Sequence, residues 1–250
     1  DTPTPENQEK VKASVRRLAE VLKTLGDAVI VQIGNENDYH VPGAGKYYFG
    51  GQDWNTINFT TPRDYYRFMN ALGAEYRAID PQHAVFLGHG ALLDRHFVLL
   101  KSYADNFDGL ALNLYPNWND GRDTATRSNV ISVDAITRVL DEQTGFAAQL
   151  RKPVVISEWG ESSKGIGEAK QAQYVANFLE AAGKFTVNNT TASKPKIIVG
   201  LIVHEYLNEP WKIAQHVIEP ELGVFRSDYQ PKLAFSALSD GFQKIAAWVV

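Results

Sequence analysis

The chain has 250 residues, of which 44% are hydrophobic and 22% charged, enough for one substantial core in a single domain spanning 1–250. A net charge of −4 provides no basic surface for phosphate backbones, so nucleic acid is not expected as a partner. The absence of cysteine excludes disulfides, thiolate metal sites and a cysteine nucleophile. No apolar run approaches the roughly 18–20 residues that span a bilayer, so no membrane is expected as a partner.

Apolar residues alternate along the chain between helical spacing and short continuous runs. The segment 6–25 has helical spacing, Gly26 ends it, and 28–33 is typical of a buried strand. The alternation repeats, with helices expected at 62–79, 92–104, 133–150, 170–183 and 231–242, and strands at 84–87, 109–114, 153–157 and 196–203. Strands separated by long helices predict right-handed βαβ units, hence an α/β fold with a parallel sheet. This alternation fits an open doubly wound sheet and a closed barrel equally.

Polar, aromatic and glycine-rich stretches follow the expected strands. These stretches are 35–54, 115–121, 159–167 and 205–211. In parallel α/β folds the C-terminal ends of the strands carry the chemistry. We therefore expect the functional site at this edge of the sheet.

Two of the strand ends carry a glutamate in a similar context. Glu36 follows Ile33-Gly-Asn35, and Glu158 follows an apolar run and precedes Trp159-Gly. A carboxyl group at the rim of a core is partly desolvated, which raises its pKa, while a second one in a hydrogen-bonded position stays ionised. Retaining cleavage of a glycosidic bond needs such a pair about 5–5.5 Å apart, one as acid/base and one as nucleophile.

A single glutamate after a strand fits a loop salt bridge or a helix cap equally well. Two of them, one preceded by asparagine and one followed by Trp-Gly, favour the catalytic interpretation. His40, His89 and His204 also lie near strand ends, but no H-x-H or H-E-x-x-H spacing accompanies them. We therefore expect neither a metal nor a cofactor, and predict that His89 is a hydrogen-bonding residue at the rim.

The Asn35-Glu36 pair and Glu158 together resemble the large clan of retaining (β/α)8 glycoside hydrolases that includes cellulases, mannanases and β-1,3-glucanases. The resemblance implies a TIM (β/α)8 barrel in which Glu36 is the acid/base at the end of the fourth strand and Glu158 the nucleophile at the end of the seventh. It also implies that Asn35 contacts the sugar 2-hydroxyl, and that Tyr115, after the sixth strand, hydrogen-bonds the nucleophile.

The C-terminal part is closest to bacterial β-1,3-glucanase-like and glucanosyltransferase-like members of the clan. The segments 203–212 and 222–232 resemble their last strand and closing segment. On that resemblance, Glu205 and Trp211 bind substrate near the donor sugar. Trp159 and Trp211 are predicted to stack on sugar rings through their faces. An alternative role for these tryptophans is to cover the barrel core.

Only one helix precedes Glu36, so the resemblance assigns strands four to eight to this chain and leaves the first three βα units without a counterpart. Three explanations are open: a longer polypeptide whose first segment is absent from the sequence, a partner chain that supplies the missing strands, or a reduced barrel. The polar opening 1–5, with its two prolines, favours the first, since it suits a strand-to-helix loop.

The sequence therefore predicts a retaining β-glycoside hydrolase of the endo-β-glucanase or transglycosylase type, acting on oligo- or polysaccharides. We expect it to be secreted or periplasmic rather than cytoplasmic. A non-catalytic carbohydrate-binding or assembly subunit on the same scaffold is the alternative, followed by a metal-dependent barrel hydrolase.

Overall fold

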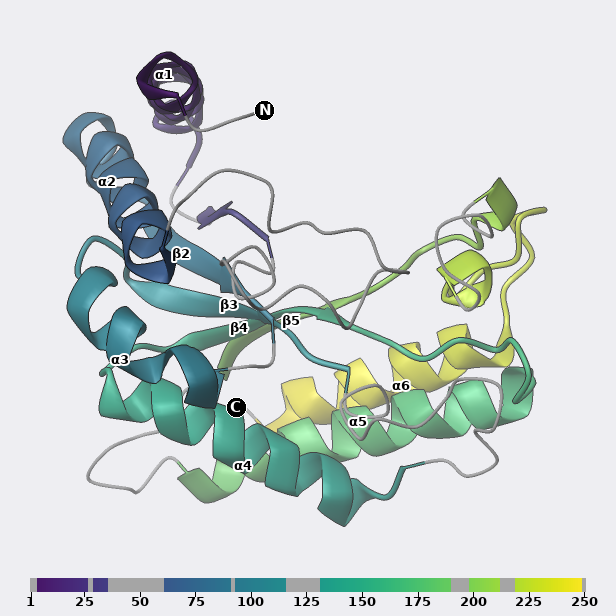
Figure 1. Ribbon diagram of the computed structural model, residues 1–250. Coiled ribbons are helices and arrows are strands. Elements are labelled where there is room, and N and C mark those ends of the chain that lie inside the picture. The colour runs from purple at the N-terminus through teal and green to yellow at the C-terminus, as the bar shows by residue number, and fades with distance from the viewer. Residues whose placement is uncertain are drawn as a thin grey trace. The chain divides into compact units, whose positions relative to one another are not determined.

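The computed structural model describes residues 4–26, 29–35, 61–90, 93–115, 131–189, 198–211 and 219–248 (Figure 1). The helices are α1 (Pro5–Leu22), α2 (Pro62–Ile79), α3 (Leu93–Tyr103), α4 (Val133–Gln149), α5 (Glu168–Asn189) and α6 (Leu233–Trp248), with a 3-10 turn η5 (Glu219–Glu221). The strands are β1 (Ile30–Ile33), β2 (Ala84–His89), β3 (Gly109–Asn113), β4 (Val154–Trp159) and β5 (Ile198–Val203). Every helix and strand expected from the sequence is present, so the predicted alternation is confirmed.

The five parallel strands form one sheet in the order β1-β2-β3-β4-β5. Ile30 pairs with Ala84 in β2, and Phe86 pairs with Gly109 in β3. A doubly wound sheet reverses its strand order at a switch point, whereas a (β/α) barrel adds its strands in sequence. The unreversed order decides the question left open by the sequence in favour of the barrel type.

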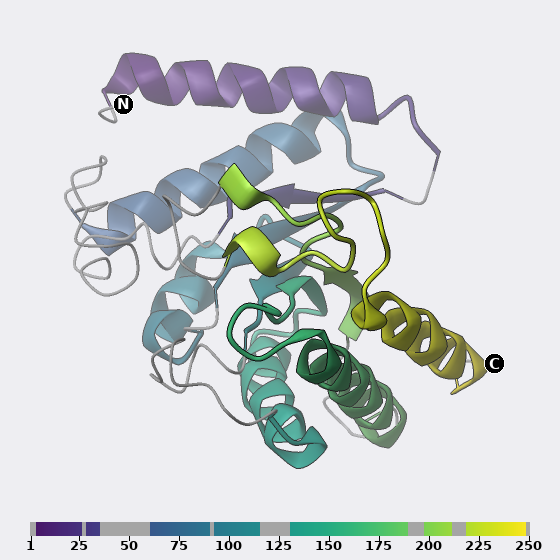
Figure 2. The ribbon, with the colours of Figure 1, turned by 90° about the vertical axis from the view of Figure 1, so that its right-hand side faces the viewer.

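The chain divides into two compact units, which we call the N-terminal unit (Asp1–Asn113 and Gln149–Val155) and the C-terminal unit (Leu114–Ala148 and Ile156–Val250). In the N-terminal unit, α1 packs beside α2 (Figure 2). Both helices begin with a Thr-Pro pair: Thr4 and Thr61 each accept a hydrogen bond from a backbone N–H of the first turn, and the proline that follows has no N–H to satisfy.

A buried cluster of polar side chains lies at the C-terminal end of α2, in the N-terminal unit. The Asp80 carboxylate accepts hydrogen bonds from the Tyr76 hydroxyl at 2.8 Å and from His83 Nδ1 at 2.6 Å. The other ring nitrogen of His83 lies 3.2 Å from Gly26 O, in the loop after α1. Burial opposes ionisation of Asp80, but the hydrogen bonds from His83 and Tyr76 outweigh it and hold the pKa of Asp80 below its usual value. The cluster thereby ties α2 to the loop that leads into β1.

In the C-terminal unit, α5 and α6 run side by side, as both views show (Figures 1 and 2). Leu179 of α5 packs against Gly241 of α6, where any side chain would overlap it. Phe178, Tyr174 and Leu179 on α5 are buried and form the inner face of the helix. This apolar face covers the part of the sheet that carries Glu158.

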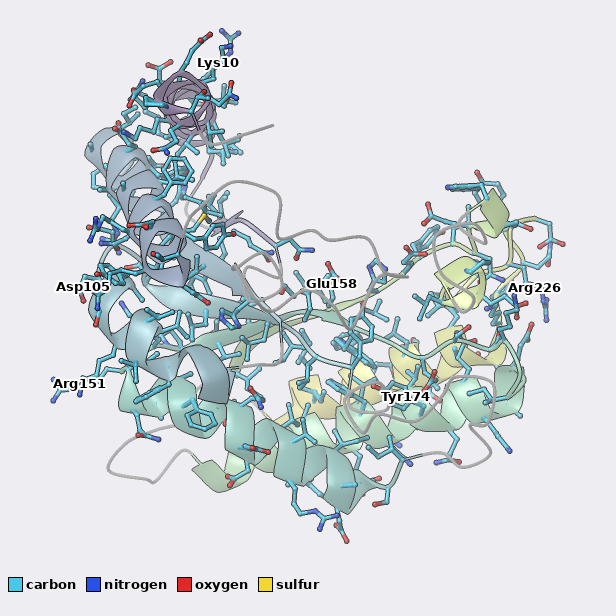
Figure 3. All side chains as sticks on the ribbon, in the orientation of Figure 1. Lys10, Asp105, Arg151, Glu158, Tyr174 and Arg226 are labelled. Carbon is cyan, nitrogen blue, oxygen red and sulfur yellow. The ribbon has the colours of Figure 1, made fainter. Side chains whose placement is uncertain are left out.

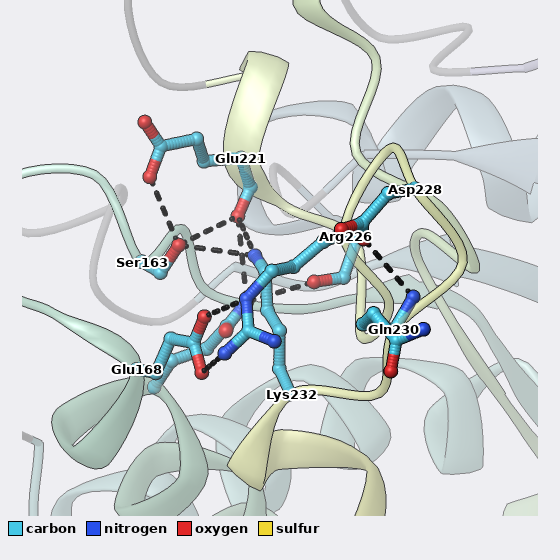
Figure 4. A network of polar contacts seen from close by, with 9 residues as sticks. Ser163, Glu168, Glu221, Arg226, Asp228, Gln230 and Lys232 are labelled. Atoms are coloured by element: carbon cyan, nitrogen blue, oxygen red, sulfur yellow. Dashed lines mark hydrogen bonds and ion pairs between the residues drawn. The ribbon is translucent and has the colours of Figure 1, made fainter.

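A buried polar network joins the loop after β4 to the segment after η5 (Figure 4). Lys232 Nζ donates to Ser163 Oγ and to the Glu221 carbonyl, both at 3.0 Å. Ser163 Oγ in turn donates to Glu221 Oε2 at 3.0 Å. Next to it, Arg226 donates two hydrogen bonds of 2.8 Å to the Glu168 carboxylate. The loop that follows the candidate nucleophile is thus fixed by the closing part of the chain.

Burial lowers the pKa of Lys232 to about 8 from 10.5, against the attraction of Glu221 and Glu168. Between about pH 8 and pH 10.5, Lys232 is protonated in the unfolded chain and deprotonated in the folded chain. The free energy of unfolding therefore rises with pH from about 8 to about 10.5, and the lysine contributes least to stability below this window.

We expect the difference in unfolding free energy between the wild type and Lys232→Met to increase across this window by on the order of 3 kcal/mol. Urea denaturation at several pH values measures it. The matched control is Lys244→Met on α6, an exposed lysine, for which the difference should stay constant. A Lys232→Met difference that is equally flat contradicts the prediction.

Candidate active site

Glu158 lies near the C-terminal end of β4, where the strand emerges from the core (Figure 3). The four preceding residues of β4 are buried, whereas the Glu158 side chain is 26% exposed. Its Oε2 atom accepts a hydrogen bond of 3.0 Å from the Tyr115 hydroxyl. The backbone supports this contact, since Leu114 N donates to Glu158 O at 2.7 Å. Tyr115, two residues after β3, thus fixes one carboxylate oxygen of Glu158.

A second neighbour of Glu158 comes from the segment after β5. His204 Nδ1 lies 3.9 Å from Glu158 Oε2, and His204 Nε2 lies 2.9 Å from Glu205 Oε1. The ring of His204 also meets the ring of Tyr115 edge-on, with centroids 6.3 Å apart. Glu205, predicted to bind substrate, has a side chain that is 10% exposed. It contacts His204, and His204 in turn contacts Glu158, so the imidazole ring links the two carboxylates.

Trp159 does not take the place predicted for it. Its side chain is fully buried, and its ring stacks on Phe178 of α5 with centroids 4.2 Å apart and planes 7° from parallel. Successive side chains of a strand point to opposite faces of the sheet, so Glu158 at the site places Trp159 on the helix side. The prediction that Trp159 stacks on a sugar is wrong, and its role in packing the core against α5 replaces it.

Trp211, in contrast, is 65% exposed, as is Tyr206 at 62%, both on the segment after β5. Tyr206 rests on Phe225, with ring centroids 4.6 Å apart, and Phe225 rests on Phe235. Contact with Phe225 supports the ring of Tyr206, which stays largely exposed at the surface. Stacking of a sugar on Trp211 stays a prediction.

Asn35 belongs to the N-terminal unit and lies just after β1. Its Oδ1 atom accepts hydrogen bonds from Gln32 Nε2 at 3.2 Å and from Asn113 Nδ2 at 3.1 Å. Asn113, the last residue of β3, is almost fully buried. The side-chain oxygen of Asn35 is thereby fixed by two hydrogen bonds. Glu36 and His40 lie outside the described residues.

His89, predicted to be a hydrogen-bonding rim residue, is fully buried at the end of β2. Its Nε2 atom lies 2.8 Å from the Tyr66 hydroxyl, and its Nδ1 atom 3.2 Å from Gly90 O. The hydrogen-bonding part of the prediction is confirmed, but the residue lies in the core rather than at the rim. In the described ranges there is no group of three or more acidic or histidine side chains that could hold a metal ion.

Two residues of the site were not identified from the sequence. By its sequence position His204 is a candidate metal ligand, and Asn113 is part of a predicted strand. Their common signal is a polar side chain at the C-terminal end of an apolar strand, the same signal that identified Glu158. Which of these side chains are in contact depends on which strands are neighbours in the sheet. The sequence does not show this order.

No protein-family model matches the sequence, and no curated protein matches it. Solved structures do. A GH5_18 enzyme of Streptomyces cattleya, in complex with GlcNAc, aligns with a TM-score of 0.71 and 17% identity over 97% of this chain and 54% of that one. A β-glucuronidase of Faecalibacterium prausnitzii aligns with a TM-score of 0.63 and 19% identity, over 96% of this chain and 35% of that one.

Xylanase 10B of Thermotoga maritima aligns with a TM-score of 0.59 and 13% identity, over 99% of this chain and 70% of that one. The chain thus spans about half the length of the Streptomyces enzyme and a third of the glucuronidase. These proteins share a TIM barrel, which matches the sequential order of the five strands. The chain therefore shares the (β/α)-barrel fold of these enzymes.

Proposed function

We propose that this chain acts as a retaining β-glycoside hydrolase with Glu158 as its nucleophile. The observation that carries the proposal is the hydrogen bond of 3.0 Å from Tyr115 to Glu158, at the end of a strand in a glycoside hydrolase fold. The ionised carboxylate is the form that attacks and can only accept hydrogen bonds, and the Tyr115 hydroxyl donates one to it. It also fixes one oxygen atom and leaves Oε1 for the anomeric carbon.

The reaction proceeds in two displacements. Glu158 Oε1 attacks the anomeric carbon as the bond to the leaving oxygen breaks, and a protonated Glu36 transfers its proton to that oxygen. Water, or a hydroxyl group of a second sugar, then gives a proton to Glu36 and attacks the same carbon, which releases Glu158. Asn35, whose oxygen is held by Gln32 and Asn113, donates its amide N–H to the sugar 2-hydroxyl.

The stereochemistry of the first product tests the mechanism. With an aryl β-glycoside, proton NMR within the first turnovers should show the β anomer, because two inversions restore the configuration. An α anomer as the first product would assign an inverting mechanism and remove the nucleophilic role of Glu158.

The substrate class we propose is a β-glucan, cleaved internally or transferred to another sugar. The exposed faces of Trp211 and Tyr206 after β5 support a site for several sugar units, since pyranose rings stack on such faces. Incubation with laminarin, mixed-linkage glucan, mannan and cellulose, with product sizes read by mass spectrometry, separates the candidates. Products longer than the substrate indicate transfer. In keeping with a polymeric substrate, we propose a secreted or periplasmic location.

We also propose that further βα units complete the barrel beside β5, carried by a preceding segment or by a partner chain. Val199 and Ile202 of β5 are 47% and 56% exposed, and aliphatic side chains on an end strand are normally covered. No helix in the described ranges is long and apolar enough to cross a membrane. An active monomer of 27.8 kDa in solution would contradict the proposal.

A further inference from the structure

Both nitrogen atoms of His204 face a carboxylate. Nε2 is 2.9 Å from Glu205 Oε1, a hydrogen-bonding distance, and Nδ1 is 3.9 Å from Glu158 Oε2, within range of an ion pair. The ring is 30% exposed, so neither contact is fully screened by solvent. The three side chains form a row in which one imidazole separates two acidic groups.

A neutral imidazole carries only one N–H, whereas an ionised carboxylate can only accept hydrogen bonds. If His204 donates from Nε2 to Glu205, the lone pair of Nδ1 faces the oxygen of Glu158, which is unfavourable. A second proton on Nδ1 turns this contact into attraction. The arrangement therefore favours the imidazolium as long as Glu158 and Glu205 are both ionised.

We propose that His204, oriented by Glu205, is a positioning residue that serves as the counter-ion of the Glu158 carboxylate. The inference deepens the proposed function and rests on it, because it assigns a partner to the candidate nucleophile. When Glu158 becomes esterified by the sugar, its charge is lost and the attraction ends. When the ester is cleaved, the imidazolium stabilises the carboxylate that departs from the anomeric carbon.

The backbone holds His204 in this position. His204 N donates to Trp159 O at 2.8 Å, next to Glu158 in the chain. A side chain at Gly160 would overlap the carbonyl oxygen of His204, so the two segments approach as closely as glycine permits. On the other side, Val224 N donates to Glu205 O at 3.1 Å. The acidic pair and the imidazole are therefore placed by paired backbone and not by flexible side chains alone.

Among the described residues, the titratable groups placed against the ring of His204 are Glu158 on β4, Glu205 on its own segment, and Tyr115 after β3. The Tyr115 hydroxyl donates to Glu158, and as a neutral phenol it carries no positive charge that could replace the imidazolium. We expect the charge state of His204 to respond to each of these two glutamates.

Histidine resonances in NMR spectra of the complete protein test this without any turnover. The His204 signal is assigned by its loss in His204→Gln, and its titration is followed in the wild type, in Glu158→Gln and in Glu205→Gln. Each amide keeps the size of the side chain and removes its charge. We expect the midpoint to fall by about one pH unit in either variant, the effect of losing an opposite charge within about 4–6 Å.

The control is Glu180→Gln, which removes the same charge from α5, where Glu180 pairs with Lys184. Its midpoint should equal that of the wild type. A His204 midpoint that does not move in Glu158→Gln overturns the inference, whether or not the protein hydrolyses glycosides. An equal shift in the Glu180→Gln control overturns it as well, because a general change in charge then explains the result.

Kinetics with an activated aryl glycoside, for which cleavage of the ester limits the rate, add a second readout. His204→Gln should lower kcat and KM together by about tenfold, the factor that corresponds to one pH unit, while kcat/KM changes little. A merely structural role predicts a loss in kcat/KM, which would count against the counter-ion. Absence of turnover in the wild type would instead be a failure of the proposed function, and the NMR titration distinguishes the two.

Discussion

Replacement of Glu158 by alanine should reduce kcat on an activated aryl β-glycoside by roughly 10⁴–10⁶-fold, the scale of loss when an enzyme loses its nucleophile. The variant lacks the atom that forms the bond to the anomeric carbon, whereas the rest of the site is unchanged. Tyr115 then loses Oε2 as an acceptor, but the preceding residue Leu114 still pairs with the backbone of position 158. Initial rates of aryl release measure the effect.

Azide should restore part of this activity, because a small anion fits the space left by the carboxylate and attacks the same carbon. The product is then an α-glycosyl azide, which mass spectrometry and NMR identify. Glu180→Ala on α5 is the control and should keep wild-type rates. Unchanged activity in Glu158→Ala would end the proposal, and binding of oligosaccharides without turnover in the wild type would favour the carbohydrate-binding alternative.

Of the proposed substitutions, Trp159→Ala should lower the free energy of unfolding most, by about 3–5 kcal/mol. The side chain is fully buried and stacked on Phe178, so its removal leaves a large cavity between β4 and α5. Urea denaturation measures the change. Activity per folded molecule should fall less than in Glu158→Ala, since the indole does not touch the sugar.

Trp211→Ala is the matched control, because this tryptophan is 65% exposed. Its unfolding free energy should change by less than about 0.5 kcal/mol, as is usual for a surface substitution. If Trp211 stacks on substrate, KM for oligosaccharides rises instead. A loss of stability in Trp211→Ala equal to that in Trp159→Ala would contradict the contrast drawn between the two residues.

The elements of the fold were predictable because each carries a clear local signal. The Thr61-Pro62 pair gives α2 its start, and α2 ends at Ile79 as expected. The apolar runs of β2 and β3 are buried on both faces, which is why they are continuous in the sequence. Helix ends carry a weaker local signal, and α5 extends from Glu168 to Asn189, beyond the range expected from its apolar spacing.

The site was predictable only in part. Glu158 follows from its position at the end of an apolar run and Tyr115 from the family resemblance, and the structure brings their oxygen atoms to 3.0 Å. The error at Trp159 has a simple cause, since neighbours on a strand face opposite sides, and a catalytic Glu158 already implied a buried Trp159. His204 was missed because its contact depends on the pairing of β4 with β5, which lies in the fold and not in the spacing of residues.

Covalent trapping tests the central claim most directly. A 2-deoxy-2-fluoro β-glycoside with an activated leaving group forms an ester with the nucleophile of a retaining enzyme and cleaves slowly. After incubation with the active protein, digestion and mass spectrometry should place the added sugar on the peptide that contains Glu158, and Glu158→Gln should remain unlabelled. Label on another carboxylate, or turnover of the parent glycoside with no label at all, would contradict the assignment of Glu158 as the nucleophile.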